Sequence, residues 1–143
     1  MSKISIQAEE KPLMRCLIVD DEIYAIEGVA DYLGEIGGFE IVATCCSAME
    51  AIEVLKTQKI DLLFLDINMP LLTGLEFLEL LDRPPLTILT TAYAEFALDG
   101  FRLNVVDYLL KPYSLQRFLQ LLVRHRNYIN LNCCWKKMIV QKW

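Results

Sequence analysis

Three acidic side chains follow two apolar segments that have the composition of buried strands. Asp20 and Asp21 come directly after the segment RCLIV, and Asp66 comes directly after the segment LLFL. Carboxylates brought close together repel one another, which either raises the pKa of one of them or requires a cation between them. Oxygen ligands of this kind favour Mg²⁺, which keeps several of its waters, over Zn²⁺. Each aspartate alone could equally cap a helix or shape a turn, so the prediction depends on their joint pattern.

A hydroxyl group and an ammonium group follow two later apolar segments. The segment LTILT is followed by Thr91 and Ala92, and the segment DYLL is followed by Lys111. Thr91 alone could be a helix cap and Lys111 alone an ordinary loop residue, whereas Ala92 leaves room for a bulky bound group. Together with the carboxylates, these groups are those needed to accept a phosphoryl group on an aspartate and to neutralise its charge.

Short apolar segments alternate with amphipathic segments along the chain. The apolar segments are typical of buried parallel strands, and they cover residues 14–19, 40–45, 61–65, 86–90 and 105–110. Apolar residues at helical spacing predict helices around residues 23–33, 51–55, 75–81, 94–101 and 115–128. This alternation predicts an α/β fold, a doubly wound five-stranded parallel sheet of the (βα)5 flavodoxin-like type. Ligands of such folds bind beyond the carboxyl ends of the strands, where all the polar residues above would lie.

The composition is that of one compact domain. The chain has 143 residues, of which 55% are hydrophobic and 23% charged, and this excludes a disordered chain. Its net charge of −5 gives no attraction to nucleic acid or to an anionic membrane. No apolar run could span a bilayer and the first residues do not form a signal peptide, so we expect a cytoplasmic protein. The five cysteines show no C-x-x-C spacing and are expected to be reduced, mostly buried thiols.

Three regions are expected along the chain. Residues 1–12 are polar and form a flexible leader, and residues 13–126 form the folded domain. Residues 127–143 form a C-terminal extension that contains three lysines and no acidic residue. This extension could lengthen the last helix, begin a linker to a DNA-binding domain absent from this chain, or be an altered terminus. His125, the only histidine, lies late in the last predicted helix, and a surface role is expected for it.

The order of the motifs DD, LDINMPLLTG, TA and KP resembles the response-regulator receiver domain of two-component signalling, which is CheY-like. The resemblance covers residues 14–126. Within it, the stretch TTAYAEFALDGFRLNVVDYLLKPYSLQRF looks like the receivers that precede LytTR-type (LytR/AlgR) DNA-binding domains. The resemblance implies a strand order of 2-1-3-4-5 and a signalling phosphoprotein of transcription regulation, with self-catalysed phosphorylation and dephosphorylation as its only reactions.

The resemblance also implies a role for each polar residue at the strand ends. Asp66 would be the phosphoacceptor, taking the phosphoryl group from a sensor histidine kinase. Asp21, Asp66 and the backbone carbonyl of Asn68 would bind Mg²⁺ directly, and Asp20 would act mainly through water. Lys111 would pair with a phosphoryl oxygen, and the Lys111-Pro112 peptide bond is expected to be cis. Gly74 and Pro70 match the glycine and the proline of the loop that follows the acceptor.

Further residues would bind the phosphoryl group or report its presence. Thr91 would donate its hydroxyl to a phosphoryl oxygen beside Ala92, and this movement would let Tyr108 turn inward as the switch aromatic. Alternatively, Tyr108 would be a half-buried tyrosine of the strand with no role in switching. Tyr93 would shield the phosphoryl group from water and slow its hydrolysis. The surface around residues 94–128 would then support phosphorylation-dependent homodimerisation.

Three other classes of protein are alternatives to a phosphorylated receiver domain. A phosphatase of the haloacid-dehalogenase type needs a second aspartate two residues after the nucleophile, where this chain has Asn68. A nucleotide-binding Rossmann domain needs a glycine-rich turn after its first strand, where this chain has DDEIYAIEG. A pseudo-receiver, which would be a protein-interaction module that is never phosphorylated, stays open as the alternative function.

Overall fold

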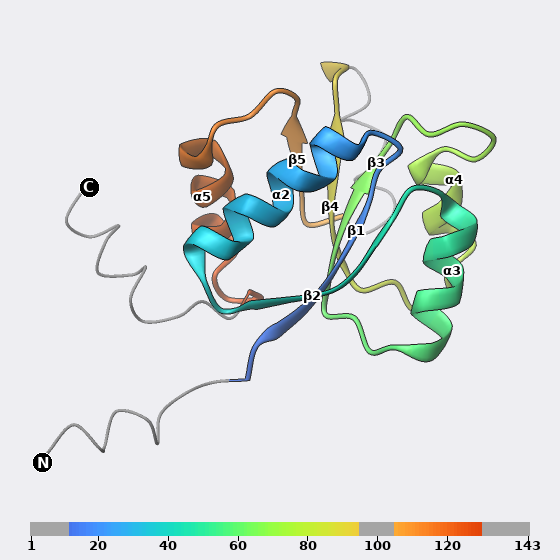
Figure 1. The fold of residues 1–143 in the computed structure, drawn as a ribbon, viewed down its shortest axis with the longest axis horizontal. Helices are drawn as coiled ribbons and strands as arrows, with labels where there is room; N and C mark the ends of the chain where they lie inside the picture. Colours follow the sequence, from blue (N-terminus) through green and yellow to red (C-terminus); the bar gives the residue numbers. More distant parts are fainter. Residues whose placement is uncertain (1–11, 95–104, 130–143) are drawn as a thin grey trace, which may run out of the picture.

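The computed structural model describes residues 12–94 and 105–129 of the chain. Five parallel strands form one sheet in the order β2-β1-β3-β4-β5 (Figure 1). They are β1 (Met14–Val19), β2 (Phe39–Cys45), β3 (Leu62–Asp66), β4 (Leu86–Thr91) and β5 (Asp107–Leu110). The predicted fold class and strand order are therefore confirmed.

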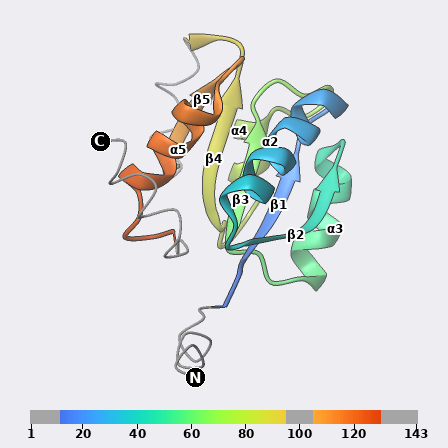
Figure 2. The same ribbon diagram turned by 60° about the vertical axis from the view of Figure 1, so that its left-hand side comes forward.

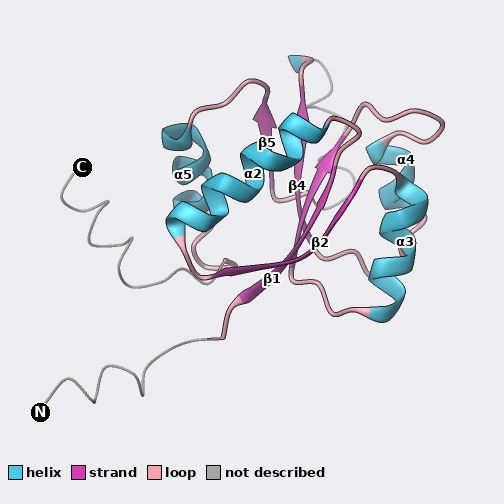
Figure 3. Cartoon of the chain, in the orientation of Figure 1, coloured by secondary structure: helices cyan, strands magenta, loops and turns pink. Residues whose placement is uncertain are grey.

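Helices cover both faces of this sheet. They are α2 (Ile23–Ile36), α3 (Ala48–Thr57), α4 (Gly74–Glu79) and α5 (Leu115–Arg124). Figures 1 and 2 show α2 and α5 on one face and α3 and α4 on the other, and Figure 3 shows the same three layers by element type. None of the helices among the described residues is long and apolar enough to cross a membrane.

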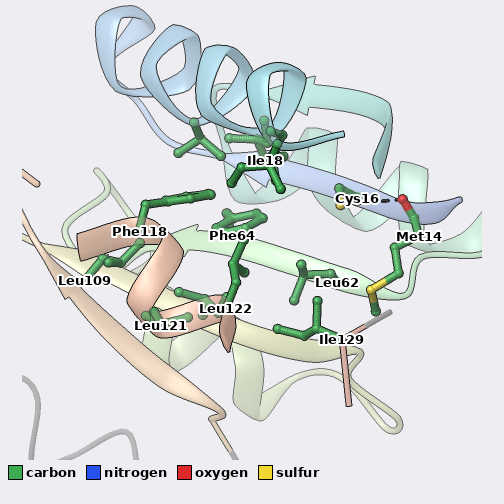
Figure 4. Packing of buried hydrophobic residues seen from close by; sticks show 14 of the residues in the cluster. Met14, Cys16, Ile18, Leu62, Phe64, Leu109, Phe118, Leu121, Leu122 and Ile129 are labelled. Carbon is green, nitrogen blue, oxygen red and sulfur yellow. Dashed lines mark hydrogen bonds between the residues drawn. The ribbon is translucent and has the colours of Figure 1, made fainter. Parts of the chain in front are cut away.

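The two faces of the sheet have separate cores because successive strand residues point to opposite sides. In β3, Phe64 belongs to the core under α2 and α5, whereas Leu63 and Leu65 belong to the core under α3 and α4. On the first face the Phe64 and Phe118 rings stack with their centroids 5.5 Å apart (Figure 4). All five residues of β3 are buried. Burial on both faces of the sheet explains why the strand is apolar at every position before Asp66.

Hydroxyl side chains begin three of the four helices that the structure describes. The side chains of Ser47, Thr73 and Ser114 each accept a hydrogen bond from a backbone N–H in the first turn of the helix that follows. Such N-caps stabilise a helix by about 1 kcal/mol. The helix α2 begins differently, because its N-cap residue Glu22 forms no side-chain cap.

Several predicted boundaries differ from the structure. The last strand begins at Asp107 instead of residue 105, and β3 includes Asp66 as its final residue. The helix α5 was predicted to reach residue 128 but ends at Arg124, because the chain leaves the helix at His125 and then buries Ile129 in the core. Ile23, expected on the apolar face of its helix, is exposed.

Some expectations fall outside the described residues. The predicted helix over residues 94–101 lies outside the described residues except for Ala94. Nearly all of the predicted leader and of the predicted extension also lie outside them. Among the described cysteines, Cys16 and Cys45 are buried, Cys46 is exposed, and all three are free thiols. The predicted domain limits therefore stay predictions, whereas the thiol state agrees with expectation for these three residues.

Candidate functional site

The carboxylates of Asp20, Asp21 and Asp66 meet at the carboxyl edge of the sheet. β1 and β3 are neighbouring parallel strands in which Val19 lies opposite Leu65. The residues that follow these two partners are Asp20 and Asp66, so the register itself places the two carboxylates side by side. One ligand oxygen from each of the three aspartates lies within 4.8 Å of the others.

Asp66 is a buried carboxyl group with an unusual proton affinity. Only 3% of the residue is exposed. Burial, and then the negative charge of Asp20, raise the pKa of Asp66 to about 7, although the charge of Lys111 and the Asn68 backbone N–H act against this. That N–H donates to Asp66 Oδ1 over 3.3 Å. In the absence of a bound cation, Asp66 is therefore partly protonated near neutral pH.

Lys111 is the cation among these carboxylates. Its Nζ lies 2.9 Å from Asp20 Oδ2, 3.2 Å from Glu22 Oε1 and 3.5 Å from Asp66 Oδ1. Burial by itself would lower the pKa of Lys111, but the hydrogen bond and charge of Asp20, with smaller contributions from Asp66 and Glu22, raise it above its ordinary value. The Lys111 side chain is therefore held as an ammonium group.

The sequence analysis missed Glu22. Its carboxylate reaches Lys111 from the start of α2, across 89 positions of sequence. The sequence did contain a signal, because a third acidic residue follows Asp20 and Asp21 at the same strand end. An acidic residue before a helix is, however, usually a favourable N-terminal charge, and nothing local indicates that its side chain turns to a distant lysine.

Thr91 is the last residue of β4 and is buried. Its hydroxyl donates to the side-chain oxygen of Asn68 over 3.1 Å and accepts the backbone N–H of Tyr93 over 3.0 Å. The Thr91 carbonyl accepts the backbone N–H of Lys111 over 2.7 Å, so the two residues are joined through the main chain. Ala92 and Tyr93 follow and are exposed.

Tyr108 lies in β5, half-buried, and its ring packs against the core under α3 and α4. Its backbone carbonyl accepts a hydrogen bond from Arg117 Nη2 over 3.2 Å. A hollow of about 500 Å³ lies beside the ring, and its described lining comprises Thr91, Ala94, Asp107, Tyr108, Leu110 and Arg117. Thr91, whose movement is predicted to let Tyr108 turn, and Tyr108 itself therefore line the same space.

Backbone geometry shapes the loop that follows the acceptor. The Gly74 N–H donates to the Ile67 carbonyl over 2.8 Å, and a Cβ atom on Gly74 would fall on the backbone carbonyl oxygen of Asp66. Leu71 in the same loop has a φ of 70° and is fully exposed. On the other side of the site the Lys111-Pro112 peptide bond is cis, as the resemblance implied.

His125 is partly exposed and pairs with a carboxylate of β5. Its Nε2 lies 2.8 Å from Asp107 Oδ2, and its side chain is 19% exposed. The same carboxylate oxygen accepts from Arg124 Nη1 over 3.1 Å. This cluster joins the first residue of β5 to the end of α5, at the opposite end of that strand from Lys111, so His125 does not reach the aspartates.

The site has the donor set for a hard divalent cation. The three aspartates provide oxygen ligands only, and their charges exceed the single charge of Lys111. Mg²⁺ is bound in proteins by one or two carboxylates together with waters and phosphoryl oxygens, which this cluster matches. A buried carboxylate, a cation site and an ammonium group in one place can accept a phosphoryl group and stabilise its charge.

Comparison with known proteins agrees with this geometry. Residues 16–123 match the response regulator receiver domain. An uncharacterised response regulatory protein of Shewanella oneidensis is 40% identical over 116 residues, which is 80% of this chain and 49% of that protein. The transcriptional regulatory protein BtsR of Escherichia coli is also 40% identical over 116 residues, with 80% of this chain and 48% of BtsR covered. The chain thus spans about half the length of these relatives.

Solved structures show the same fold. The response regulatory domain of protein mrkE from Klebsiella pneumoniae superposes with a TM-score of 0.72 at 29% identity, and the match covers 87% of this chain and 99% of that domain. The REC domain of AraT, a response regulator from Geobacillus stearothermophilus, gives a TM-score of 0.70 at 33% identity, with 78% and 92% covered.

Proposed function

Because the chain belongs to the family of response regulator receiver domains, we propose that it is a phosphoacceptor that takes a phosphoryl group onto Asp66 from a sensor histidine kinase. The observation that carries the proposal is the placing of Asp66. Its carboxylate is buried, lies 3.5 Å from the Lys111 ammonium, and shares a cation-binding cluster with two further aspartates.

The chemistry of the acceptor follows from these neighbours. A carboxylate oxygen of Asp66 attacks the phosphorus of the donor, an O–P bond forms, and the N–P bond to the kinase imidazole breaks. Mg²⁺ bound by Asp21, Asp66 and the Asn68 carbonyl, with Asp20 acting through water, would neutralise charge on the phosphoryl oxygens. The Lys111 ammonium neutralises more of this charge from the side of β5.

The same site contains a means of signalling its state. In the resting protein the Thr91 hydroxyl is engaged by Asn68 and by the Tyr93 backbone. A phosphoryl oxygen on Asp66 offers that hydroxyl a charged acceptor, which forms a stronger hydrogen bond than a neutral amide. Movement of Thr91 toward the phosphoryl group, beside Ala92, opens space next to Tyr108, and the ring turns into it.

The output is proposed to be transcription regulation. The supporting observations are the similarity to BtsR, a transcriptional regulatory protein, and the stretch at residues 90–118 that looks like receivers of the LytTR type. The surface around residues 94–128 would form a phosphorylation-dependent homodimer, and DNA would be bound by a domain other than this receiver. We place the protein in the cytoplasm, with no reaction beyond its own phosphorylation and dephosphorylation.

A direct test uses acetyl phosphate and Mg²⁺. The wild-type protein and Asp66→Asn are incubated with both, and intact mass is measured. A gain of one phosphoryl group by the wild type alone is the expected result, and it disappears when Mg²⁺ is chelated. Absence of any gain would favour the pseudo-receiver, whereas equal gains by both proteins would place the acceptor elsewhere.

A further inference from the structure

Glu22 is the acidic contact of Lys111 that the proposed chemistry does not use. It occupies the N-cap position of α2 with an extended backbone (φ −105°, ψ 120°) and leaves that helix without a side-chain cap. Its carboxylate instead accepts from Lys111 Nζ over 3.2 Å. A serine or threonine at this position would supply a stabilising cap, so this contact replaces a local source of stability.

The partners of Lys111 differ greatly in their exposure. The side chains of Asp20 and Asp66 are 6% and 3% exposed, whereas the Glu22 side chain is 67% exposed. The Lys111 side chain itself is 16% exposed. Glu22 therefore contacts the ammonium from the solvent side. Because water can solvate its carboxylate, breaking this contact costs less free energy than breaking the contacts to the buried aspartates.

An ammonium group has three N–H donors, and in the resting protein three carboxylates lie within ion-pair distance of them. A phosphoryl oxygen on Asp66 that pairs with Lys111 must therefore take a donor from one of these carboxylates. Asp20 makes the shortest contact, at 2.9 Å, and Asp66 carries the phosphoryl group itself. Of the contacts to Asp20 and Glu22, the one to the exposed Glu22 side chain is the contact that a phosphoryl oxygen displaces more readily.

We propose that Glu22 is a positioning residue that competes with the phosphoryl group for Lys111. Its charge holds the ammonium in the resting arrangement, so that Lys111 is less available to a phosphoryl oxygen on Asp66. This inference rests on the proposed phosphoacceptor function. It adds a residue that limits how readily the protein is phosphorylated without its kinase.

The test compares Glu22→Gln with Glu27→Gln. Both substitutions remove one negative charge at or near the start of α2 and keep the side-chain shape. Glu27, however, is exposed and contributes to none of the ion pairs of Lys111. Each protein is incubated with acetyl phosphate and Mg²⁺, and the rate and the steady-state fraction of phosphorylation are measured by intact mass. In this reaction the Asp66 O–P bond forms, the acetyl O–P bond breaks and acetate leaves.

We expect Glu22→Gln to raise the rate constant about two- to fivefold over wild type, the range that loss of an exposed charge contact gives. Glu27→Gln should stay near the wild-type rate. The affinity of the Mg²⁺-loaded protein for beryllofluoride, a phosphoryl mimic, should rise by a similar factor in Glu22→Gln only. This readout is an equilibrium with bound mimic, and a residue that merely begins a helix would not change it.

A double-mutant cycle shows whether the effect passes through Lys111. In a Lys111→Ala background, phosphorylation is slower and Glu22→Gln should change it no more than Glu27→Gln does. An equal gain with and without Lys111 would overturn the inference, as would identical rates for Glu22→Gln and Glu27→Gln in proteins that keep Lys111. Those results leave the proposed function standing, whereas a wild type that gains no phosphoryl group removes both.

Discussion

β5 has an ion cluster at each end, and the two clusters have opposite compositions. Beyond its carboxyl end the Lys111 ammonium contacts the carboxylates of Asp20 and Asp66. At its amino end the Asp107 carboxylate contacts the Arg124 guanidinium and the His125 ring. In the first cluster one cation contacts several carboxylates, and in the second one carboxylate contacts two basic side chains.

This difference in composition indicates which of the two clusters would bind a cation. Excess negative charge in the Lys111 cluster is relieved by a proton or by a cation from outside. Burial, and then the negative charge of Asp20, accordingly raise the pKa of Asp66. The Asp107 carboxylate is satisfied by residues of its own chain and serves to hold β5 to the end of α5. Charge imbalance, and not the number of ionic contacts, distinguishes the functional cluster from the structural one.

Removal of Lys111 should have the largest effect on this comparison. Lys111→Ala leaves buried carboxylates without their cation, so the free energy of unfolding at pH 7 in Mg²⁺-free buffer should fall by about 3 kcal/mol. Urea unfolding measures this loss. The variant should still accept a phosphoryl group slowly but fail to rearrange at Thr91 and Tyr108, which side-chain NMR follows. A Lys111→Ala protein that switches normally would contradict the role given to this residue.

The pH dependence of stability should come from Asp66. Its pKa in the folded protein, about 7, is higher than the ordinary value of 3.8, so the folded state holds the proton more tightly than the unfolded chain does. This contribution is complete below about pH 4 and is lost as the pH rises to about 7, at up to about 1.4 kcal/mol per pH unit. Urea unfolding between these pH values should show the decrease in the wild type.

Two controls sharpen the pH experiment. Asp66→Asn cannot ionise at this position, so it should lack most of the decrease. Mg²⁺ favours the ionised carboxylates and should also reduce it in the wild type. A decrease of equal size in Asp66→Asn would assign the titration to another group.

Disruption of the other cluster should have a smaller effect, confined to stability. Asp107→Asn removes contacts to side chains that are 60% and 19% exposed, so the free energy of unfolding should fall by about 1 kcal/mol. The initial rate of phosphorylation by acetyl phosphate should equal that of the wild type. A large loss of that rate would show that the two ends of β5 are coupled and would break the comparison.

The smallest expected effect concerns the exposed rim of the site. Tyr93 is 54% exposed and follows Thr91 by two positions, where its ring can restrict the access of water to a phosphoryl group on Asp66. Tyr93→Ala should shorten the half-life of the phosphorylated protein by a few fold, as measured by intact mass after removal of the donor. Tyr93→Phe, which keeps the ring, is the matched control, and unchanged half-lives in both variants would remove this role.

Much of the fold could be predicted because the local pattern and the tertiary environment agree. The run LLFL is apolar at every position, and β3 is buried on both faces. Errors occurred where a distant contact decides the outcome. The helix before residue 128 was predicted too long, because burial of Ile129 and the contact of His125 with Asp107 end it early.

The sequence by itself determined that the polar residues Asp20, Asp66 and Lys111 stand at the ends of apolar strand segments, and parallel strands all present their carboxyl ends at one edge. Only the tertiary structure decided which side chains pair there. Lys111 meets Glu22 across 89 positions of sequence because all the strands are parallel, so the carboxyl ends of β1 and β5 lie at the same edge of the sheet with two strands between them. Burial, which raises the pKa of Asp66, likewise depends on the whole packed sheet and on no residue taken alone.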